Sequence, residues 1–174
     1  MTAARRRDEI VQALAGASGP VSAAALAARL GVSRQVVVGD VALLRAAGSP
    51  IVATPRGYVL GGGQEGGGVR CTVACRHGLD GLLDELYTVA DCGCGVLDVT
   101  VEHPVYGQLS GQLQVFSRYD ADVFWDALQK NGAQPLCSLT GDIHLHTLVC
   151  PDEARKARVL AALEEKGYLM GLEK

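Results

Sequence analysis

The stretch SAAALAARLGVSRQVVVGDVALLRAAG, residues 22–48, decides the fold of the first part of the chain. Ser22 can cap a short alanine-rich helix that stops at Gly31, and Ser33 can cap a second helix that stops at Gly48. Two helices separated by a glycine-containing turn of about three residues are typical of the helix-turn-helix. The stretch therefore predicts this motif, with its second helix in the position of a recognition helix.

The segments on either side of this motif extend it to a winged helix. Apolar residues recur at helical spacing between Ala4 and Ala15, which predicts one more helix before the pair. After the pair, residues 51–54 and 58–60 flank Pro55-Arg56-Gly57, and this pattern predicts a short hairpin with an arginine at its tip. Three helices and a basic hairpin indicate a winged-helix domain over residues 1–60.

A winged helix reads DNA with polar side chains from the first turns of its recognition helix, here residues 34–47. Arginines near the end of that helix and on the wing suit contacts with phosphates or the minor groove. The candidate DNA-binding residues are Ser33, Arg34, Gln35, Arg45 and Arg56. The arginine run 5–7 is expected to add contacts with the DNA backbone. A solvated basic face without a nucleic-acid partner is the alternative.

Charge is divided unevenly along the chain. Residues 1–60 hold seven basic and three acidic residues, a net charge of +4, whereas the remainder holds nine basic and 16 acidic residues, a net charge of −7. A basic N-terminal part followed by an acidic remainder is typical of a DNA-binding domain joined to a separate effector domain, because only the DNA-binding domain must neutralise phosphates. A winged helix of this size reads only a few base pairs, so a homodimer on a palindromic operator is expected.

The sequence contains neither a membrane span of about 20 apolar residues nor the apolar core of a signal peptide. We therefore expect a cytoplasmic protein without a membrane partner. All six cysteines follow residue 70, and in a reducing compartment they are expected to be thiols that pack as small apolar groups.

Six glycines between residues 61 and 68 predict an interdomain linker, because this composition neither packs nor holds a helix. After the linker, hydrophobic periodicity alternates between strand and helix. Strands are expected at 69–75, 96–101, 108–116 and 143–150, with a last edge strand at 168–170, and helices at 79–89, 121–130 and 151–166. This order predicts an α+β domain over residues 69–174, an α/β sandwich with helices on one face of a sheet.

All four histidines lie in this second domain, and three of them suggest a metal site. His144 and His146 are two residues apart on a predicted strand, so their side chains leave the same face. His77 ends the first strand of the domain, and Glu85 follows about two helical turns later. Three imidazoles and a carboxylate suit zinc, nickel, cobalt or iron. A surface histidine pair without a ligand is the alternative, and Cys92-Gly93-Cys94 and Cys71 with Cys75 are rival donors.

His103 and Tyr106 lie in the segment VEHPVYG, residues 101–107, where a proline and a glycine force a turn at the end of a strand. Polar and aromatic groups in this position are candidates for lining a small-molecule pocket. A turn in which the two side chains satisfy backbone groups is the equal alternative.

The chain resembles the niacin-responsive transcriptional repressors of the NiaR type, which join a winged helix-turn-helix to a three-histidine domain. The resemblance extends over about residues 5–170. It is carried by GVSRQVVVGDVALLRAAG at 31–48, PIVATPRGYVL at 50–60, ELYTVAD at 85–91, LDVTVEHPVYGQL at 97–109 and PLCSLTGDIHLHTL at 135–148.

The resemblance implies a repressor of genes for NAD synthesis or niacin uptake, with nicotinic acid as co-repressor. It also implies one divalent transition metal ion per chain, nickel or zinc, held by His77, Glu85, His144 and His146. Nicotinate is expected beside the metal, at an open coordination position. Arg118 is a weaker candidate partner for its carboxylate.

Two other functions compete with this interpretation. A regulator that responds to metal alone would use every one of the same ligands. An enzyme, either a metal-dependent hydrolase or a bifunctional repressor-ligase, is the alternative of another class. The sequence lacks a His-Glu-x-x-His motif, and its glycine run carries no basic residue for a nucleotide. We therefore expect a regulator and not an enzyme.

Overall fold

A computed structural model of the chain describes residues 2–61 and 68–171. The chain divides into two compact units between residues 65 and 66. This boundary falls within the predicted linker, residues 61–68, of which 62–67 lie outside the described residues. In the described ranges, no helix is both long and apolar enough to cross a membrane.

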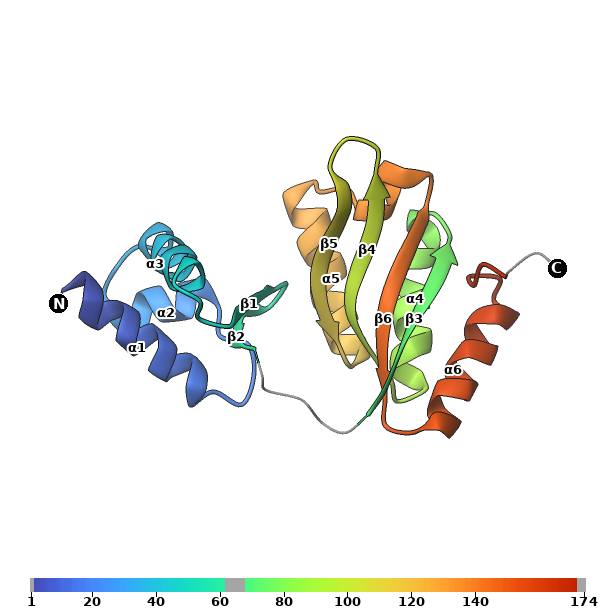
Figure 1. The fold of residues 1–174 in the computed structure, drawn as a ribbon, viewed down its shortest axis with the longest axis horizontal. Coiled ribbons are helices and arrows are strands. Elements are labelled where there is room, and N and C mark those ends of the chain that lie inside the picture. The colour runs from blue at the N-terminus through green and yellow to red at the C-terminus, as the bar shows by residue number, and fades with distance from the viewer. Residues whose placement is uncertain (1, 62–67, 172–174) are drawn as a thin grey trace. The chain divides into compact units, whose positions relative to one another are not determined.

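The first unit is a winged helix (Figure 1). Its elements are α1 (Ala3–Ala15), α2 (Ala23–Leu30), α3 (Arg34–Ala46), β1 (Ile51–Thr54) and β2 (Gly57–Leu60). The side chains of Thr2, Ser22 and Ser33 cap the three helices by accepting hydrogen bonds from main-chain N–H groups three residues later. The helices pack around a core that includes Ile10, Leu26 and Val37. The winged helix predicted from the sequence is confirmed, with helix ends within one residue of expectation.

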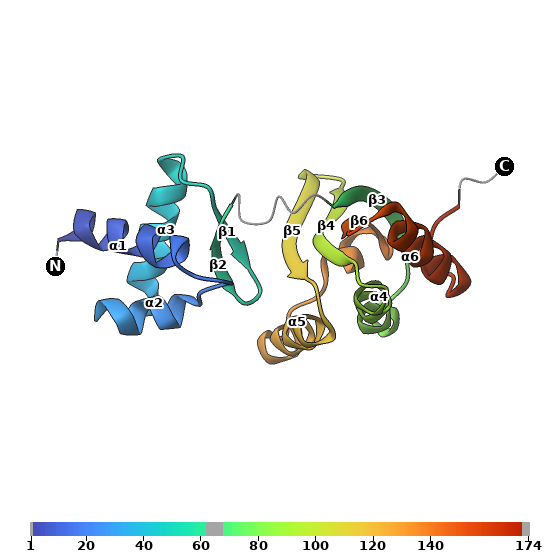
Figure 2. The ribbon, with the colours of Figure 1, turned by 90° about the horizontal axis from the view of Figure 1, so that it is seen from below.

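The second unit is an α+β domain built on one antiparallel sheet. Its elements are β3 (Val69–Arg76), α4 (Leu79–Asp91), β4 (Gly95–His103), β5 (Gly107–Val115), α5 (Arg118–Asn131), the 3-10 helix η1 (Leu136–Thr140), β6 (Ile143–Cys150) and α6 (Glu153–Glu165). The strand order is β3-β6-β4-β5. Helices α4, α5 and α6 lie on one side of the sheet, as Figures 1 and 2 show, which confirms the predicted architecture.

Strand β6 shows why the sheet buries only one face. Its residues alternate strictly, with His144, His146 and Leu148 buried toward the helices and Ile143 and Leu145 exposed on the other side. Successive side chains of a strand point to opposite faces, so the same alternation that buries the apolar residues also carries both histidines inward.

Three parts of the second unit differ from the expectation. Helix α5 begins at Arg118, three residues before the expected start, because the side chain of Ser117 caps it. Helix η1 was not expected. Residues 168–170 form a single bridge, Leu169 to Cys75, in place of a strand, although two main-chain hydrogen bonds flank it.

Candidate metal centre and DNA-binding helix

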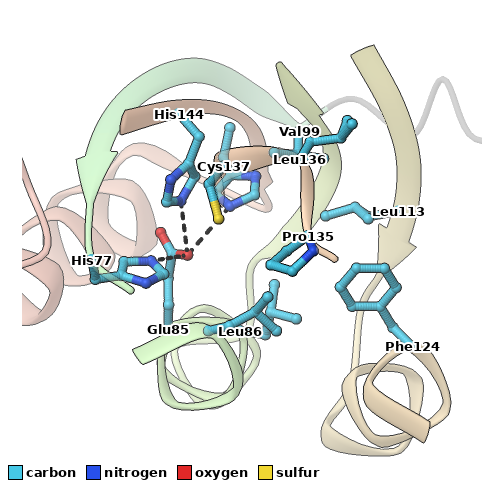
Figure 3. A pocket seen from close by; sticks show the side chains of 12 residues that line it. His77, Glu85, Leu86, Val99, Leu113, Phe124, Pro135, Leu136, Cys137 and His144 are labelled. Atoms are coloured by element: carbon cyan, nitrogen blue, oxygen red, sulfur yellow. Dashed lines mark hydrogen bonds and ion pairs between the residues drawn. The ribbon is translucent and has the colours of Figure 1, made fainter. Parts of the chain in front are cut away.

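The four predicted metal ligands come together in the second unit, where three histidines surround one carboxylate oxygen (Figure 3). Oε2 of Glu85 lies 2.6 Å from Nε2 of His77 and 3.3 Å from Nε2 of both His144 and His146. Glu85 is 1% exposed, and His144 and His146 are 3% and 4% exposed. Residues from β6 and α4, together with the residue that directly follows β3, thus form one compact, buried cluster.

Each histidine is oriented by the main chain through its other ring nitrogen. Nδ1 contacts a carbonyl oxygen in the pairs His77 with Gly78 (3.0 Å), His144 with Asp142 (3.0 Å) and His146 with Asp98 (2.6 Å). A carbonyl oxygen only accepts, so each Nδ1 carries the hydrogen. This fixes the tautomer in which Nε2 holds a lone pair, the arrangement typical of histidine ligands.

Without a cation, every protonation state of the cluster leaves an unfavourable contact. If each Nε2 also carried a hydrogen, three imidazolium ions would be buried against one carboxylate. If only one did, the charges would balance, but the lone pairs of the other two rings would face the same carboxylate oxygen. In addition, Oε1 of Glu85 is buried and has no hydrogen-bond partner among the described residues. Three imidazole nitrogens and a carboxylate fit a divalent transition ion, which would satisfy all of these atoms.

The pKa values in the cluster move in opposite directions. Burial alone would raise the pKa of Glu85, but His146, His144 and His77 together lower it well below its usual value. Burial would lower the pKa of His77 and of His146, but the nearby Glu85 carboxylate raises both. The carboxylate is therefore ionised and available as a ligand.

A bulge in β4 helps to place His146. The pairing of β4 with both of its neighbours shifts between Val96 and Asp98. At this point the carbonyl of Asp98 turns to Nδ1 of His146, while its Oδ1 accepts a hydrogen bond from the main-chain N–H of Thr147 at 3.2 Å. Bulges commonly re-aim a side chain beside a functional site, and here the bulge does so for His146.

A cavity adjoins the cluster (Figure 3). The cluster forms its polar end, together with the buried thiol-bearing Cys137. Its other walls are apolar and come from α4, β4, β5, α5 and the segment that leads into η1. These walls are Leu82, Leu86, Val99, Leu113, Phe124, Pro135 and Leu136. The cavity has a volume of about 30 Å³, room for about two water molecules.

The three effector candidates from the sequence do not line this cavity, and their role in effector binding stays a prediction. Nδ1 of His103 accepts hydrogen bonds from the main-chain N–H groups of Val105 and Tyr106, so it stabilises the turn between β4 and β5. Tyr106 is 74% exposed. Arg118 binds the Asp91 carboxylate with two nitrogens, at 2.8 and 2.6 Å, and its guanidinium lies over the ring of Tyr87.

The candidate DNA-binding residues gather on α3 and the hairpin of the first unit. Ser33 caps α3, while Arg34, Gln35 and Arg45 are exposed along it. Arg56 lies in the turn between β1 and β2 and is half-buried. The start of α3 is therefore open to a partner, as a recognition helix requires.

The expectation for the arginine run 5–7 is corrected in part. Arg6 and Arg7 form ion pairs with the buried Asp40 in the middle of α3, at 2.5 and 3.5 Å. Two of the three arginines therefore tie α1 to α3. Arg5 pairs with Glu9 in the same helix at 3.5 Å.

Comparisons with known proteins agree with both units. Residues 6–59 match the HTH domain family, and residues 70–172 match the 3H domain family. The chain is 44% identical over 165 residues to the probable transcription repressor NiaR of Thermotoga maritima, which covers 95% of this chain and 93% of the relative. It is 40% identical over 169 residues to the transcription repressor NadR of Bacillus subtilis, which covers 96% and 94%.

The chain belongs to the NiaR-type family of transcription repressors. In this NiaR-type chain, the histidine cluster and the cavity lie within the part that matches the 3H domain, and α3 lies within the part that matches the HTH domain. Both relatives are named as repressors, which agrees with the regulator, and not an enzyme, expected from the sequence.

Sequence reasoning missed three residues that shape the 3H domain of this chain. Asp98 orients His146 with its main-chain carbonyl oxygen, and a pattern of residue types in the sequence does not predict such a contact. Cys137 borders the cluster and Phe124 lines the apolar part of the cavity, and both come from segments that are distant in sequence from the histidines. Cys137 could have been suspected, because it lies seven residues before His144, although that spacing has no established ligand pattern.

Proposed function

We propose that the chain represses transcription by binding a palindromic operator as a homodimer through α3, with nicotinic acid as co-repressor. The target genes would be those of NAD synthesis or niacin uptake. The observation that carries the proposal is the cavity that joins the His77, Glu85, His144 and His146 cluster to apolar walls. A small aromatic acid needs both halves of such a site.

The side chains that line the cavity favour a metal ion as the partner of the effector's carboxylate. No lysine or arginine is among the described residues that line it. When bound, a divalent transition ion, nickel or zinc, would supply positive charge and an open coordination position. The three histidines and Glu85 would hold it, while Val99, Leu113 and Phe124 would bind the faces of a pyridine ring and exclude water.

The small volume of the cavity suggests how effector binding is coupled to DNA binding. A pyridine carboxylate is larger than two water molecules, so we infer that Phe124 on α5 or Leu136 on η1 moves to admit it. An effector shifts an equilibrium only if it binds one state more tightly than the other. The effector would bind the state with α5 or η1 displaced more tightly than the state without this displacement. The repressor would bind DNA tightly only in the effector-bound state.

A gel-shift assay on the promoter region of neighbouring genes tests the proposal, with metal, nicotinate and nicotinamide varied separately. Metal with nicotinate should tighten operator binding by about 5- to 150-fold, the usual range of allosteric coupling. His144→Ala should lose this response and keep basal DNA binding. His103→Ala, a histidine outside the cluster, is the matched control.

Other outcomes of the assay would overturn parts of the proposal. A lack of response to any of the three ligands would rule out the co-repressor mechanism. Equal affinity for nicotinate with and without metal in the unchanged protein, or equal affinity in the metal-loaded unchanged protein and a folded His144→Ala protein, would remove the metal from it. The small cavity favours one second candidate, a repressor that responds to metal alone. Tightening by metal that nicotinate leaves unchanged would assign that function.

A further inference from the structure

Cys75 lies beside the histidine cluster, although neither the four-residue ligand set nor the cavity includes it. It is directly opposite His144 in the pairing of β3 with β6, and it lies two residues before His77, which directly follows β3. Its side chain is completely buried. The register of the sheet thus directs a thiol into the same space as the imidazoles of His77 and His144.

Three donor atoms of different residues meet at this place. Sγ of Cys75, a carboxylate oxygen of Glu85 and a ring nitrogen of His144 all lie within 4.8 Å of one another. Sulfur ligands lie about 2.3 Å from zinc and nitrogen or oxygen ligands about 2.0–2.2 Å, so donors at this separation can share one ion. The unpartnered Oε1 of Glu85 points independently to a group that is missing from this space.

The net charge of the centre argues for a second anionic ligand. A divalent ion with neutral histidines and one carboxylate carries a net charge of +1, in a place where Glu85 and His144 are almost wholly buried. A buried net charge is costly unless it is paired. In the effector-free state, the thiolate of Cys75 would bring the net charge to zero without any group from outside the chain.

We propose that Cys75 is a further ligand of the metal centre and binds the ion through its thiolate sulfur. The inference rests on the proposed metal site at His77, Glu85, His144 and His146. As the sulfur–metal bond forms, the S–H bond breaks and its proton passes to water. A thiolate ligand also favours soft ions such as zinc over hard ions such as magnesium or manganese.

Before the metal binds, the thiol keeps its proton. Burial, followed by the charge of Glu85, raises the pKa of Cys75 far above its usual value. The proton is displaced only when the ion arrives, since a coordinating thiol is deprotonated outright.

Cobalt(II) provides a direct test, because a cobalt–thiolate bond gives a charge-transfer absorption band in the near ultraviolet. The full chain is loaded with cobalt, and equilibrium dialysis measures the metal content alongside the spectrum. The band should appear in the unchanged protein, disappear in Cys75→Ser and persist in Cys137→Ser. The last variant is the matched control, since Cys137 also borders the cluster.

The outcomes separate this inference from the metal site itself. Bound cobalt without the band, a band that survives in Cys75→Ser, or a band that Cys137→Ser removes would each overturn the assignment of Cys75 while leaving the site. Absence of bound cobalt, zinc and nickel would overturn both. If Cys75→Ser does not fold, X-ray absorption of the zinc-loaded unchanged protein decides. A sulfur at about 2.3 Å supports the inference, and nitrogen and oxygen neighbours alone contradict it.

Discussion

The carbonyl oxygen of Asp98 lies 2.6 Å from Nδ1 of His146, at the point where a bulge interrupts β4. The same residue accepts a hydrogen bond from the N–H of Thr147 with its side chain. Asp98 therefore fixes the position of His146 with two contacts. Its carbonyl oxygen contacts the imidazole ring, and its side chain binds the main-chain N–H of the next residue, Thr147. Such outer partners of a histidine ligand set the direction of its lone pair.

Asp98→Ala should weaken zinc binding by about tenfold, the lower end of the effect usual for outer partners of ligands. The variant loses the oxygen that anchors Thr147 but keeps its own carbonyl. Asp98→Asn retains an acceptor oxygen and should bind zinc almost normally. Competition with a chelator of known affinity measures both. Equal loss in the two variants, or none in either, would contradict this role.

Metal removal should destabilise the second unit selectively. Trp125 is the sole tryptophan of the chain and packs against the core of this unit, so its fluorescence reports unfolding there. Zinc at 100 times its dissociation constant adds about 2.7 kcal/mol to the free energy of unfolding. The fluorescence midpoint should then rise by roughly 10 °C and return on addition of a chelator. A similar rise in a folded His144→Ala protein would count against the site.

Arg45→Ala should lower the salt dependence of operator binding. Arg45 is exposed in the last turn of α3, and each phosphate contact contributes about one to the slope of log affinity against log salt concentration. A change toward zero by about 1 is expected if it contacts a phosphate. Lys130→Ala removes an exposed charge from α5 and should leave the slope unchanged. A slope unaltered in Arg45→Ala, with affinity also unaltered, excludes the residue from the interface.

Asp40→Ala should lower the stability of the winged helix, because it removes the buried carboxylate that pairs with Arg6 and Arg7. The midpoint of thermal unfolding, followed by circular dichroism of the full chain, should fall by several degrees. Glu9→Ala breaks an exposed pair within α1 and should have little effect. Equal midpoints in the two variants would show that burial adds nothing to the pair.

The titration of Tyr168 should lower the free energy of unfolding at high pH. Burial, followed by its hydrogen bond to Asp84, raises its pKa to about 12, whereas an unfolded tyrosine titrates near pH 10. The unfolded chain therefore loses this proton first, and the free energy of unfolding decreases from about pH 10 to about pH 12. Urea denaturation over this range should show a smaller decrease in Tyr168→Phe. The same decrease in both proteins would assign it to other groups.

The sequence was most informative where the pattern is local. Helix caps such as Ser22 and Ser33 are recognisable because their hydrogen bonds close within three residues. His144 and His146 share a face by the two-residue period of a strand, and the periodicity placed His77 and Glu85 on neighbouring elements. These local rules were enough to name the four residues of the cluster.

Features that depend on pairing between distant segments could not be predicted. Cys75 meets His144 only because of the register of β3 and β6, which hydrophobic periodicity does not determine across distant strands. Asp40 engages Arg6 across 34 residues of chain, so the charge count alone left that arginine available for DNA. Arg118 likewise finds Asp91 through the packing of α5 on α4.

The main-chain anchoring of the three histidines has a consequence for how these repressors can diversify. Because carbonyl groups hold all three rings, the orientation of the histidines does not depend on the apolar side chains of the cavity wall. Val99, Leu113 and Phe124 can therefore be replaced during evolution without disturbing the histidines. Related repressors could therefore come to respond to a different effector through changes in the cavity walls, while the metal-binding residues stay the same.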